Sequence, residues 1–367
     1  MNYYDYNPMK ILFYSKQLEK IGACEIPDPI MLEVDPCNFC NFSCSWCSSG
    51  FHLFDQEGKC KRNKYVITEG DFKSIVDFVE YKKSVKGIYW CGGGEPTLNI
   101  HLSKLMKIGK EIGVNNYITT NGSNLLRFGE NLIDLCKWVA VSVNSGSEEQ
   151  WKKLFRTNMS YEKYLEGCKV MNKYNRNTRI IEVVYKHTFD PNTYIDIEKS
   201  YELAIELGFT HVLIKPVDMF IYERNYDEKR FSEVWSREKI EHINQMIENI
   251  KRKNKENSVI NLDCGGFYGD ISKANEIKPH TRKCWVCMLN PVFGATGDIY
   301  ICCVRRSEKN VGRWDKNLKK YWGSREHKEK VWGFNPNREC PNKCKNKQYN
   351  KIVEDMYINS EFSLGHI

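Results

Sequence analysis

Three cysteines stand in the pattern Cys40-x3-Cys44-x2-Cys47, on a stretch short enough to form one tight loop. Three thiolates on such a loop can ligate three irons of a cubic [4Fe–4S] cluster, and the fourth iron then stays open to a cofactor or a substrate. The same stretch pairs Cys37-x2-Cys40 with Cys44-x2-Cys47, a spacing that supplies the four ligands of a zinc ion. The spacing alone leaves both interpretations open.

A second segment that can do chemistry, Cys91-Gly-Gly-Gly-Glu95-Pro-Thr97, directly follows the apolar run at 87–90. Consecutive glycines let a ligand approach the backbone closely. The carboxylate of Glu95, next to that bare backbone, can accept hydrogen bonds from an ammonium group. By itself, such a glycine-rich turn is also typical of an ordinary loop between a strand and a helix.

A second group of cysteines lies in the C-terminal part of the chain, at Cys284, Cys287, Cys302, Cys303, Cys340 and Cys344. The first residues, MNYYDYNPMK, lack the charged-then-apolar pattern of a signal peptide. We therefore expect a cytoplasmic protein, in which disulfides do not explain 16 cysteines. Two thiol clusters far apart in the sequence predict two metal sites. We interpret five other thiols as structural, those of Cys24, Cys37, Cys60, Cys136 and Cys168.

The elements that must position these groups form an alternating α/β pattern between residues 30 and 215. Short apolar runs predict strands at 30–34, 87–90, 117–119, 139–143, 180–185 and 211–214, with amphipathic segments between them. Thr68 and Asp71 resemble a capping box, and Gly208 stands where a glycine commonly ends a helix. Six alternations predict a parallel sheet with right-handed crossovers, whose chemistry lies at the C-terminal ends of its strands.

The chain divides into five predicted parts. We predict an N-terminal extension at 1–27, a sheet-forming core at 28–217, a helical connector at 218–257, a smaller cysteine-rich unit at 258–345 and a C-terminal tail at 346–367. In the cysteine-rich unit, apolar pairs flank Gly294-Ala-Thr-Gly297, which is typical of a β-hairpin. That hairpin would present Cys302 at the end of its returning strand.

The first two motifs together resemble the radical S-adenosylmethionine (SAM) superfamily. Cys40-x3-Cys44-x2-Cys47 matches its signature, and Gly93-Gly94-Glu95-Pro96 matches its second motif. The resemblance covers about residues 28–215 and implies a partial (β/α)6, TIM-like barrel with a SAM-binding [4Fe–4S] cluster. In that family SAM chelates the open iron through its amino and carboxylate groups. One electron breaks the C–S bond, and the resulting 5′-deoxyadenosyl radical abstracts hydrogen from an unactivated C–H bond.

The resemblance also implies individual SAM-binding residues. It places Trp46 near adenine, Asn121 of Thr120-Asn121-Gly122 at the edge of the SAM pocket, Ser142 on the ribose and Arg156 on the SAM carboxylate. Gly93, Gly94 and Glu95 complete the set, with Glu95 on the methionyl ammonium. A core aromatic is the alternative for Trp46, and a surface arginine is the alternative for Arg156.

The C-terminal cysteines resemble the SPASM and Twitch extensions of the same superfamily. Cys287-x9-Gly297-x4-Cys302 matches their opening, and Cys340-x3-Cys344 closes the set. The resemblance implies one auxiliary [4Fe–4S] cluster, held by four of five candidates: Cys284, Cys287, Cys302, Cys340 and Cys344. A zinc knuckle is the alternative. Cys303 can donate hydrogen to a substrate radical, or it can face the other side of its strand as a core residue.

Two functions fit within the family and one outside it. We expect oxidation or epimerisation of a sugar- or aminocyclitol-type small molecule, with electrons from a flavodoxin or ferredoxin. Radical modification of a peptide or protein is the alternative, as in sulfatase maturation or ribosomal peptide maturation. A zinc-stapled nucleic-acid-binding protein is the alternative from another class, but we interpret the net charge of +8 as mainly solvated lysine-rich faces. No apolar run approaches the roughly 18 residues that a membrane span needs.

Overall fold

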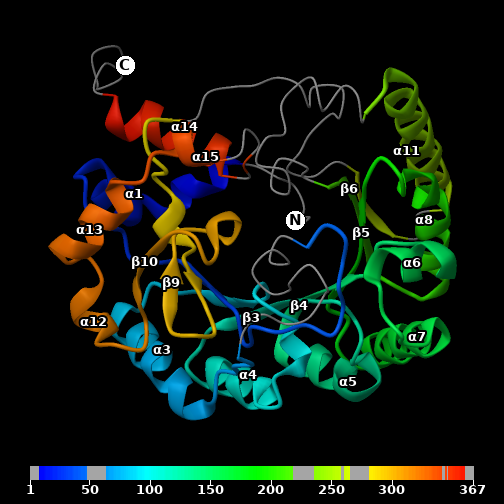
Figure 1. The fold of residues 1–367 in the computed structure, drawn as a ribbon, viewed down its shortest axis with the longest axis horizontal. Coiled ribbons are helices and arrows are strands. Elements are labelled where there is room, and N and C mark those ends of the chain that lie inside the picture. Colours follow the sequence, from blue (N-terminus) through cyan, green and yellow to red (C-terminus); the bar gives the residue numbers. More distant parts are fainter. Residues whose placement is uncertain are drawn as a thin grey trace.

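The computed structural model describes residues 8–47, 63–217, 235–257, 260–264, 281–340, 344 and 346–359. Within these residues the strands form one sheet in the order β10-β9-β8-β1-β2-β3-β4-β5-β6-β7 (Figure 1). The strands are β1 (Met31–Val34), β2 (Gly87–Trp90), β3 (Asn115–Thr120), β4 (Cys136–Ser142), β5 (Glu182–Phe189), β6 (His211–Pro216), β7 (Asn261–Cys264), β8 (Val292–Phe293), β9 (Asp298–Tyr300) and β10 (Asn310–Arg313). Neighbours from β1 to β7 are parallel, which confirms the predicted α/β class.

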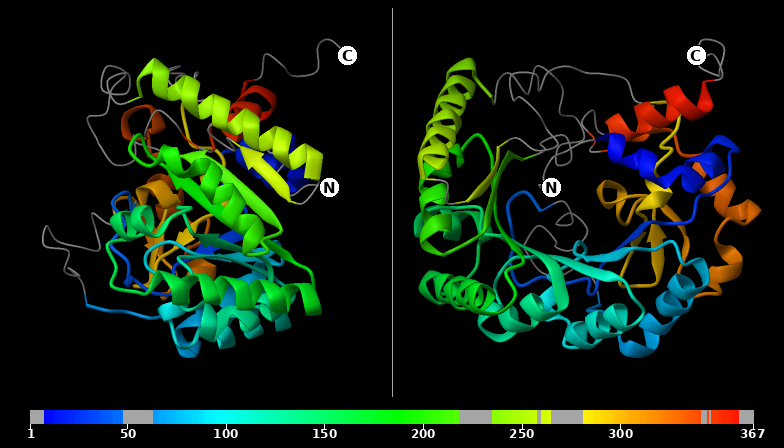
Figure 2. Two further views of the ribbon diagram at one scale, coloured as in Figure 1. Left: turned by 90° about the vertical axis from the view of Figure 1, so that its right-hand side faces the viewer. Right: turned by 180° about the vertical axis from the view of Figure 1, so that it is seen from behind.

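Helices cover the outer face of the curved sheet (Figures 1 and 2). They are α3 (Glu69–Lys82), α4 (Leu102–Glu111), α5 (Leu125–Leu135), α6 (Glu148–Phe155), α7 (Tyr161–Thr178), α8 (Ile197–Glu206) and α11 (Arg237–Asn257). The predicted capping box starts α3, because Thr68 Oγ1 accepts from the Asp71 N–H and Asp71 Oδ2 accepts from the Thr68 N–H. Gly208, predicted to end a helix, follows α8 with φ +77°.

Alternation along the parallel strands separates a packed outer face from a more open inner face. Outward residues such as Leu32, Val34 and Val141 are fully buried under the helices. Inward residues such as Tyr89 and Trp138 are only half-buried. Their rings pack edge to face, with 6.0 Å between the ring centroids. The inner face, which ends at the carboxyl ends of the strands, is therefore the surface that can receive a ligand.

The fifth strand begins later than the predicted 180–185. The side chain of Asn175, near the end of α7, bonds both the N–H and the carbonyl of Ile181 at 2.9 and 3.0 Å. Ile180 consequently takes a left-handed φ of +52° and leaves the helix in a tight turn. The first residues of the apolar run at 180–185 therefore form this turn, and only its later residues form the strand.

The sheet continues beyond residue 217, where the sequence predicted the core to end. The predicted helical spacing of isoleucines at 240–250 is confirmed in α11, in which Ile243 and Ile250 are fully buried. This helix leads into β7, which pairs in parallel with β6. The segment predicted as a connector therefore supplies another helical crossover of the same sheet.

The predicted hairpin is confirmed and joins the opposite side of the sheet. Strands β8 and β9 are antiparallel around the turn at 294–297. Strand β8 also pairs in parallel with β1, with Glu33 opposite Val292 and Val34 opposite Phe293. The cysteine-rich unit is thus continuous with the barrel sheet along β1, the strand that leads into the cluster signature.

Segments from both ends of the chain lie side by side (Figure 2). A small second core contains Ile11 and Leu18 from the N-terminal helices, Trp285 from the cysteine-rich unit and Val353 from the C-terminal helix. The helices of these parts are η1 (Pro8–Tyr14), α1 (Ser15–Gly22), α12 (Leu318–Tyr321), α13 (Arg325–Trp332), α14 (Pro336–Glu339), α15 (Lys347–Val353) and η8 (Glu354–Ile358). Across the residues that the structure describes, no helix has the length and apolar character needed to span a bilayer.

Candidate active site

The loop that leaves β1 carries the cysteines of the predicted cluster signature and is docked onto the end of α6. The N–H of Ser43 donates to the carbonyl of Phe155 (3.0 Å), and the N–H of Ser45 donates to the carbonyl of Leu154 (3.2 Å). A third backbone bond, from the Cys47 N–H to the Cys44 carbonyl (3.2 Å), tightens the loop itself. These bonds fix the backbone of the loop without using any of its thiols.

The thiols of Cys40, Cys44 and Cys47 lie within electrostatic range of one another. Burial raises the pKa of Cys40 to about 12, and the nearby charge of Glu95 adds to the rise. Uncoordinated thiolates are therefore unfavourable here, whereas bonding to a cationic cluster offsets that penalty. Three such sulfurs on one loop suit a cluster that keeps one iron open.

The contacts of Cys37 bear on the choice between a cluster and a zinc ion. Within the described ranges, no three His, Cys, Asp or Glu side chains converge as the ligands of one metal ion would. Cys37, which the zinc interpretation requires, is fully buried, and its thiol donates to the carbonyl of Glu95 at 3.0 Å. This contact favours the three-cysteine interpretation.

The glycine-rich loop after β2 rests directly on the cluster loop. The N–H of Glu95 donates to the carbonyl of Phe39 at 2.9 Å. A Cβ atom on Gly94 would overlap the backbone of Phe39 and stand 2.7 Å from its nitrogen. Gly94 is thus required for contact between two segments of this chain, in addition to any role toward SAM.

The carboxylate of Glu95 is fully buried and already accepts four hydrogen bonds. Oε1 accepts from the N–H and the hydroxyl of Thr97 (3.0 and 2.6 Å) and from the hydroxyl of Thr120 (2.6 Å). Oε2 accepts from the N–H of Asn121 (2.6 Å). Burial raises the pKa of Glu95, while these donors oppose the rise. Oε1 takes three of these four donors and Oε2 takes one, so Oε2 retains room for one further donor.

Asn121 connects this carboxylate to the cluster loop. Its side-chain amide donates to Asn41 Oδ1 (3.0 Å) and lies 3.6 Å from Cys40 Sγ. The predicted Thr120-Asn121-Gly122 turn therefore lies beside the cluster signature, at the carboxyl end of β3. The turn also requires a glycine, because Gly122 has φ +82°.

The other predicted SAM-binding residues lie around the same edge. Trp46 is half-buried against the main core. Ser142 is half-buried at the carboxyl end of β4. Arg156 is exposed and has a left-handed φ of +47°, directly after Phe155, whose carbonyl holds the cluster loop. The structure brings all three to the cluster side of the sheet, and their contacts with SAM stay predictions.

Lys186 is a site residue that the sequence analysis missed. It lies on the inner face of β5, in register with Ser142, and is half-buried. No hydrogen bond or ion pair from a described residue engages its amine. Burial lowers the pKa of Lys186, while the thiols of Cys91 and Cys44 raise it. A lysine directly after the strand predicted at 180–185, at the carboxyl end of a catalytic sheet, was the available signal.

The five predicted auxiliary cysteines come together in the C-terminal unit. Cys302 lies within electrostatic range of Cys284, Cys340 and Cys344, and Cys287 within range of Cys284 and Cys302. The thiol of Cys287 donates to the carbonyl of Cys284 at 3.0 Å, and the amide of Asn350 lies 3.5 Å from Cys284 Sγ. Four sulfur ligands for a cluster can be drawn from this group.

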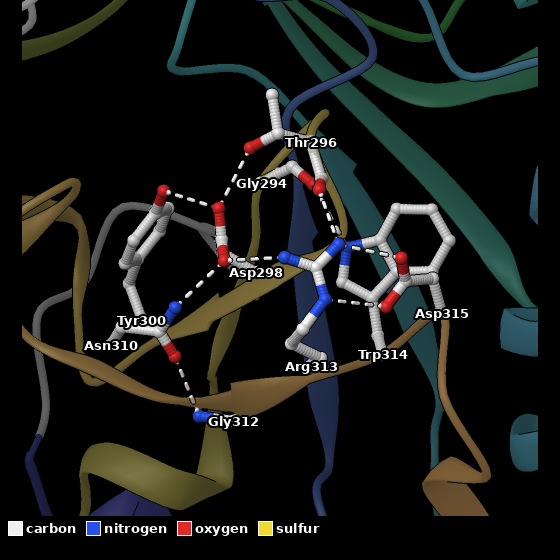
Figure 3. A network of polar contacts seen from close by, with 9 residues as sticks. All are labelled: Gly294, Thr296, Asp298, Tyr300, Asn310, Gly312, Arg313, Trp314 and Asp315. Atoms are coloured by element: carbon white, nitrogen blue, oxygen red, sulfur yellow. Dashed lines mark hydrogen bonds and ion pairs between the residues drawn. The ribbon is translucent and has the colours of Figure 1, made fainter.

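A polar network fixes the hairpin that presents Cys302 (Figure 3). Arg313 on β10 binds Asp298 on β9 (3.1 Å) and Asp315, two residues further along the chain (2.6 Å), and also donates to the carbonyl of Thr296 in the turn (2.9 Å). Gly297, the glycine of the predicted cysteine motif, has φ +93°, and a Cβ there would overlap this arginine. Cys303 follows the hairpin at the start of a short helical turn and is half-buried, so it does not occupy the strand position proposed as its alternative.

The comparisons with known proteins agree with this geometry. Residues 34–212 match the family model of the Radical SAM superfamily. The S-adenosylmethionine-dependent nucleotide dehydratase of Lacinutrix mariniflava is 29% identical over 170 residues, 44% of this chain and 34% of that protein. The UPF0026 protein MJ1312 of Methanocaldococcus jannaschii is 29% identical over 137 residues, 36% of this chain and 42% of that protein. The chain thus matches less than half of the length of either relative.

Among solved structures, SuiB of Streptococcus suis bound to its precursor peptide SuiA has a similar fold. The TM-score is 0.59 at 15% sequence identity, and the superposition covers 90% of this chain and 73% of SuiB. The family match argues against the alternative interpretation, a zinc-stapled nucleic-acid-binding protein. Residues 34–212 of the chain form a domain of the radical SAM superfamily.

Proposed function

We propose that the protein reductively cleaves SAM to a 5′-deoxyadenosyl radical, which abstracts hydrogen from a C–H bond of its substrate. The observation that carries this proposal is the junction of the cluster loop, Glu95 and Asn121 at the carboxyl edge of β1–β3. A [4Fe–4S] cluster, when bound and reduced, supplies the electron for cleavage. A flavodoxin or ferredoxin is the proposed electron donor.

The residues of the chain bind and orient SAM in this proposal. The free acceptor position on Glu95 Oε2 takes the methionyl ammonium, and Arg156 takes the carboxylate. Ser142 and Trp46 hold the ribose and adenine. In the cysteine-rich unit, four of the five gathered thiols would hold one auxiliary [4Fe–4S] cluster, which would supply an electron acceptor for the substrate radical.

We propose oxidation or epimerisation of a sugar- or aminocyclitol-type molecule as the net reaction. The inner face of the sheet supports a polar substrate, because it carries the amine of Lys186 and the hydroxyls of Tyr89 and Thr119, which lie 2.6 Å apart. Such groups can hydrogen-bond to substrate hydroxyls. Cys303 is the proposed hydrogen donor if the product is an epimer.

A peptide is the second candidate substrate. It is favoured by the fold that the chain shares with SuiB, a protein solved with its precursor peptide. In this version the auxiliary unit and the same SAM site act on a side chain or Cα–H of the peptide.

Deuterium transfer distinguishes the two substrates. We expect 5′-deoxyadenosine to gain deuterium when the enzyme, SAM and dithionite are incubated with aminocyclitols deuterated at their carbinol carbons. In D₂O an epimerised product should carry one solvent-derived deuterium, and Cys303→Ala should lose that product. Transfer from deuterated peptides alone would replace the first substrate class by the second. Failure of the protein to cleave SAM at all would contradict the proposed function itself.

We expect Glu95→Gln to weaken SAM binding by about tenfold to a hundredfold, because a charge-assisted hydrogen bond contributes about 1.5–3 kcal/mol. Iron content should change less than SAM affinity, since the Glu95 carboxylate bonds Thr97, Thr120 and Asn121 and none of the three signature thiols. Equilibrium dialysis with labelled SAM and an iron assay measure the two effects.

A matched control separates SAM binding from structural support. Thr97→Val removes one donor to Glu95 Oε1 and leaves Oε2 untouched. This variant should be destabilised by about 1 kcal/mol in thermal unfolding and should bind SAM nearly as well as the wild type. Unchanged SAM affinity in a folded, iron-replete Glu95→Gln variant would refute the assignment of Glu95 to the ammonium.

A further inference from the structure

A single arginine from the cysteine-rich unit reaches into the barrel. Arg306 follows the helical turn that starts at Cys303, and its side chain is 8% exposed. Its Nη2 lies 2.5 Å from Glu33 Oε1, and its Nε lies 2.7 Å from Asp35 Oδ2. Both carboxylates are themselves 3% exposed. This buried triad joins residues that are more than 270 positions apart in the sequence.

Stability alone is a weak explanation for the triad. Two buried carboxylates face one guanidinium, so one negative charge stays uncompensated, and burial raises the pKa of Asp35 to about 6 despite Arg306. Buried ion pairs are often no more stabilising than apolar residues of similar volume. An unfavourable arrangement of this kind is better explained by the geometry that it imposes on its neighbours.

The neighbour that it shapes is the glycine-rich loop after β2. A Cβ on Gly92, which has φ +97°, would overlap both Arg306 and Asp35. A Cβ on Gly93 would stand 2.7 Å from Asp35 Oδ2. The backbone N–H of Gly93 also donates to the Asp35 carboxylate. Gly92 and Gly93 therefore pack so closely against the Arg306–Asp35 pair that neither position has room for a side chain.

Hydrogen bonds extend this contact to the cluster signature. The next glycine, Gly94, lies against Phe39 of the cluster loop, and Glu95 bonds both Phe39 and the turn at Asn121. A continuous series of polar and packing contacts thus runs from Arg306 to Cys40. Every member of the series is buried or half-buried, so water cannot replace a missing contact cheaply.

We infer that Arg306 is a positioning residue: through Asp35 it sets the backbone of Gly92–Gly94, and the cysteine-rich unit thereby controls how tightly the barrel binds SAM. This inference rests on the proposed function, which places SAM on that loop. Arg306 touches neither a cluster ligand nor the methionyl group in this scheme. Its effect reaches SAM only through the loop.

The test uses Arg306→Lys in anaerobically purified, cluster-loaded enzyme. Lysine keeps the charge but lacks the planar fork that spans two carboxylates. We expect the iron content to stay at the wild-type level and the Kd for SAM to rise about tenfold. The rate at which saturating SAM is cleaved should stay within about twofold of the wild-type rate. Hydrogen exchange of a peptide spanning 91–98 should become faster, whereas that of the β9–β10 hairpin should not.

Arg313→Lys is the matched control, because Arg313 also bridges two carboxylates, and its partners among the described residues, Asp298, Asp315 and Thr296, all lie in the cysteine-rich unit. It should leave the SAM affinity and the exchange of 91–98 unchanged. Asp35→Ala is the second variant. It keeps the ion pair of Glu33 with Arg306, whose charges cancel, and removes the contact of the Asp35 carboxylate with Gly93. It should reproduce the faster exchange and the weaker SAM binding.

Unchanged exchange and unchanged SAM affinity in both Arg306→Lys and Asp35→Ala would overturn the inference, because Arg306 would then only hold the two units together. If the wild type itself binds no SAM, the proposed function fails, whereas the exchange of 91–98 still reports whether Arg306 positions the loop. Equal effects of Arg306→Lys and Arg313→Lys would also overturn it, since the loop contact would then be irrelevant.

Discussion

Single replacement of Cys40, Cys44 or Cys47 by alanine is expected to reduce 5′-deoxyadenosine formation to the background without enzyme. Each thiolate holds one iron, and the remaining two cannot keep a cubic cluster that is both stable and open at its fourth iron. The loop itself should survive, because its docking bonds to Phe155 and Leu154 involve backbone atoms only. The measurement is product formation under dithionite, with iron content and thermal unfolding on the same samples.

Cys37→Ala is the matched control within the same stretch of sequence. Among the described residues, its thiol donates to the carbonyls of Phe39 and Glu95, so the variant should lose some stability and retain SAM cleavage. Normal turnover in any one of the three signature variants would defeat the assignment. Loss of cleavage in a folded Cys37→Ala variant would revive a four-cysteine site.

The double variant Cys340→Ala/Cys344→Ala is expected to lose about half of its iron, since one of two four-iron clusters would go. Both residues lie near Cys302 and far along the chain from the cluster loop. The SAM site should therefore survive, and the variant should still form 5′-deoxyadenosine. Without an acceptor for the substrate electron, this cleavage should be uncoupled and oxidised product should disappear.

A buried cysteine outside both groups supplies the control for this experiment. Cys136 starts β4 in the barrel core, and Cys136→Ala should keep all of its iron. Wild-type iron in the double variant would show that Cys340 and Cys344 are not ligands. Loss of all iron would show that the two units fold as one, for which the pairing of β8 with β1 and the Arg306 triad provide a physical route.

The sequence by itself determined the features that depend on neighbouring residues. The cysteine spacing, the strand at 87–90 and the capping box of Thr68 and Asp71 all follow from local patterns, and the structure confirms the strand and the cap. A parallel sheet follows from their alternation, because strand-to-strand crossovers place successive motifs at one edge. The junction of the cluster loop with Glu95 was predictable on that ground alone.

Only the tertiary structure decided what each of these groups touches. The triad of Arg306, Glu33 and Asp35 joins distant segments, and no periodicity in either segment encodes the pairing. The same holds for β8, whose addition to β1 merges two units that the sequence separates. Glu95 carries a ligand-like carboxylate in the sequence, yet in the fold most of its acceptor capacity serves Thr97, Thr120 and Asn121. Local sequence sets which side chains are available, whereas long-range packing sets which of their hydrogen-bonding positions remain free for a ligand.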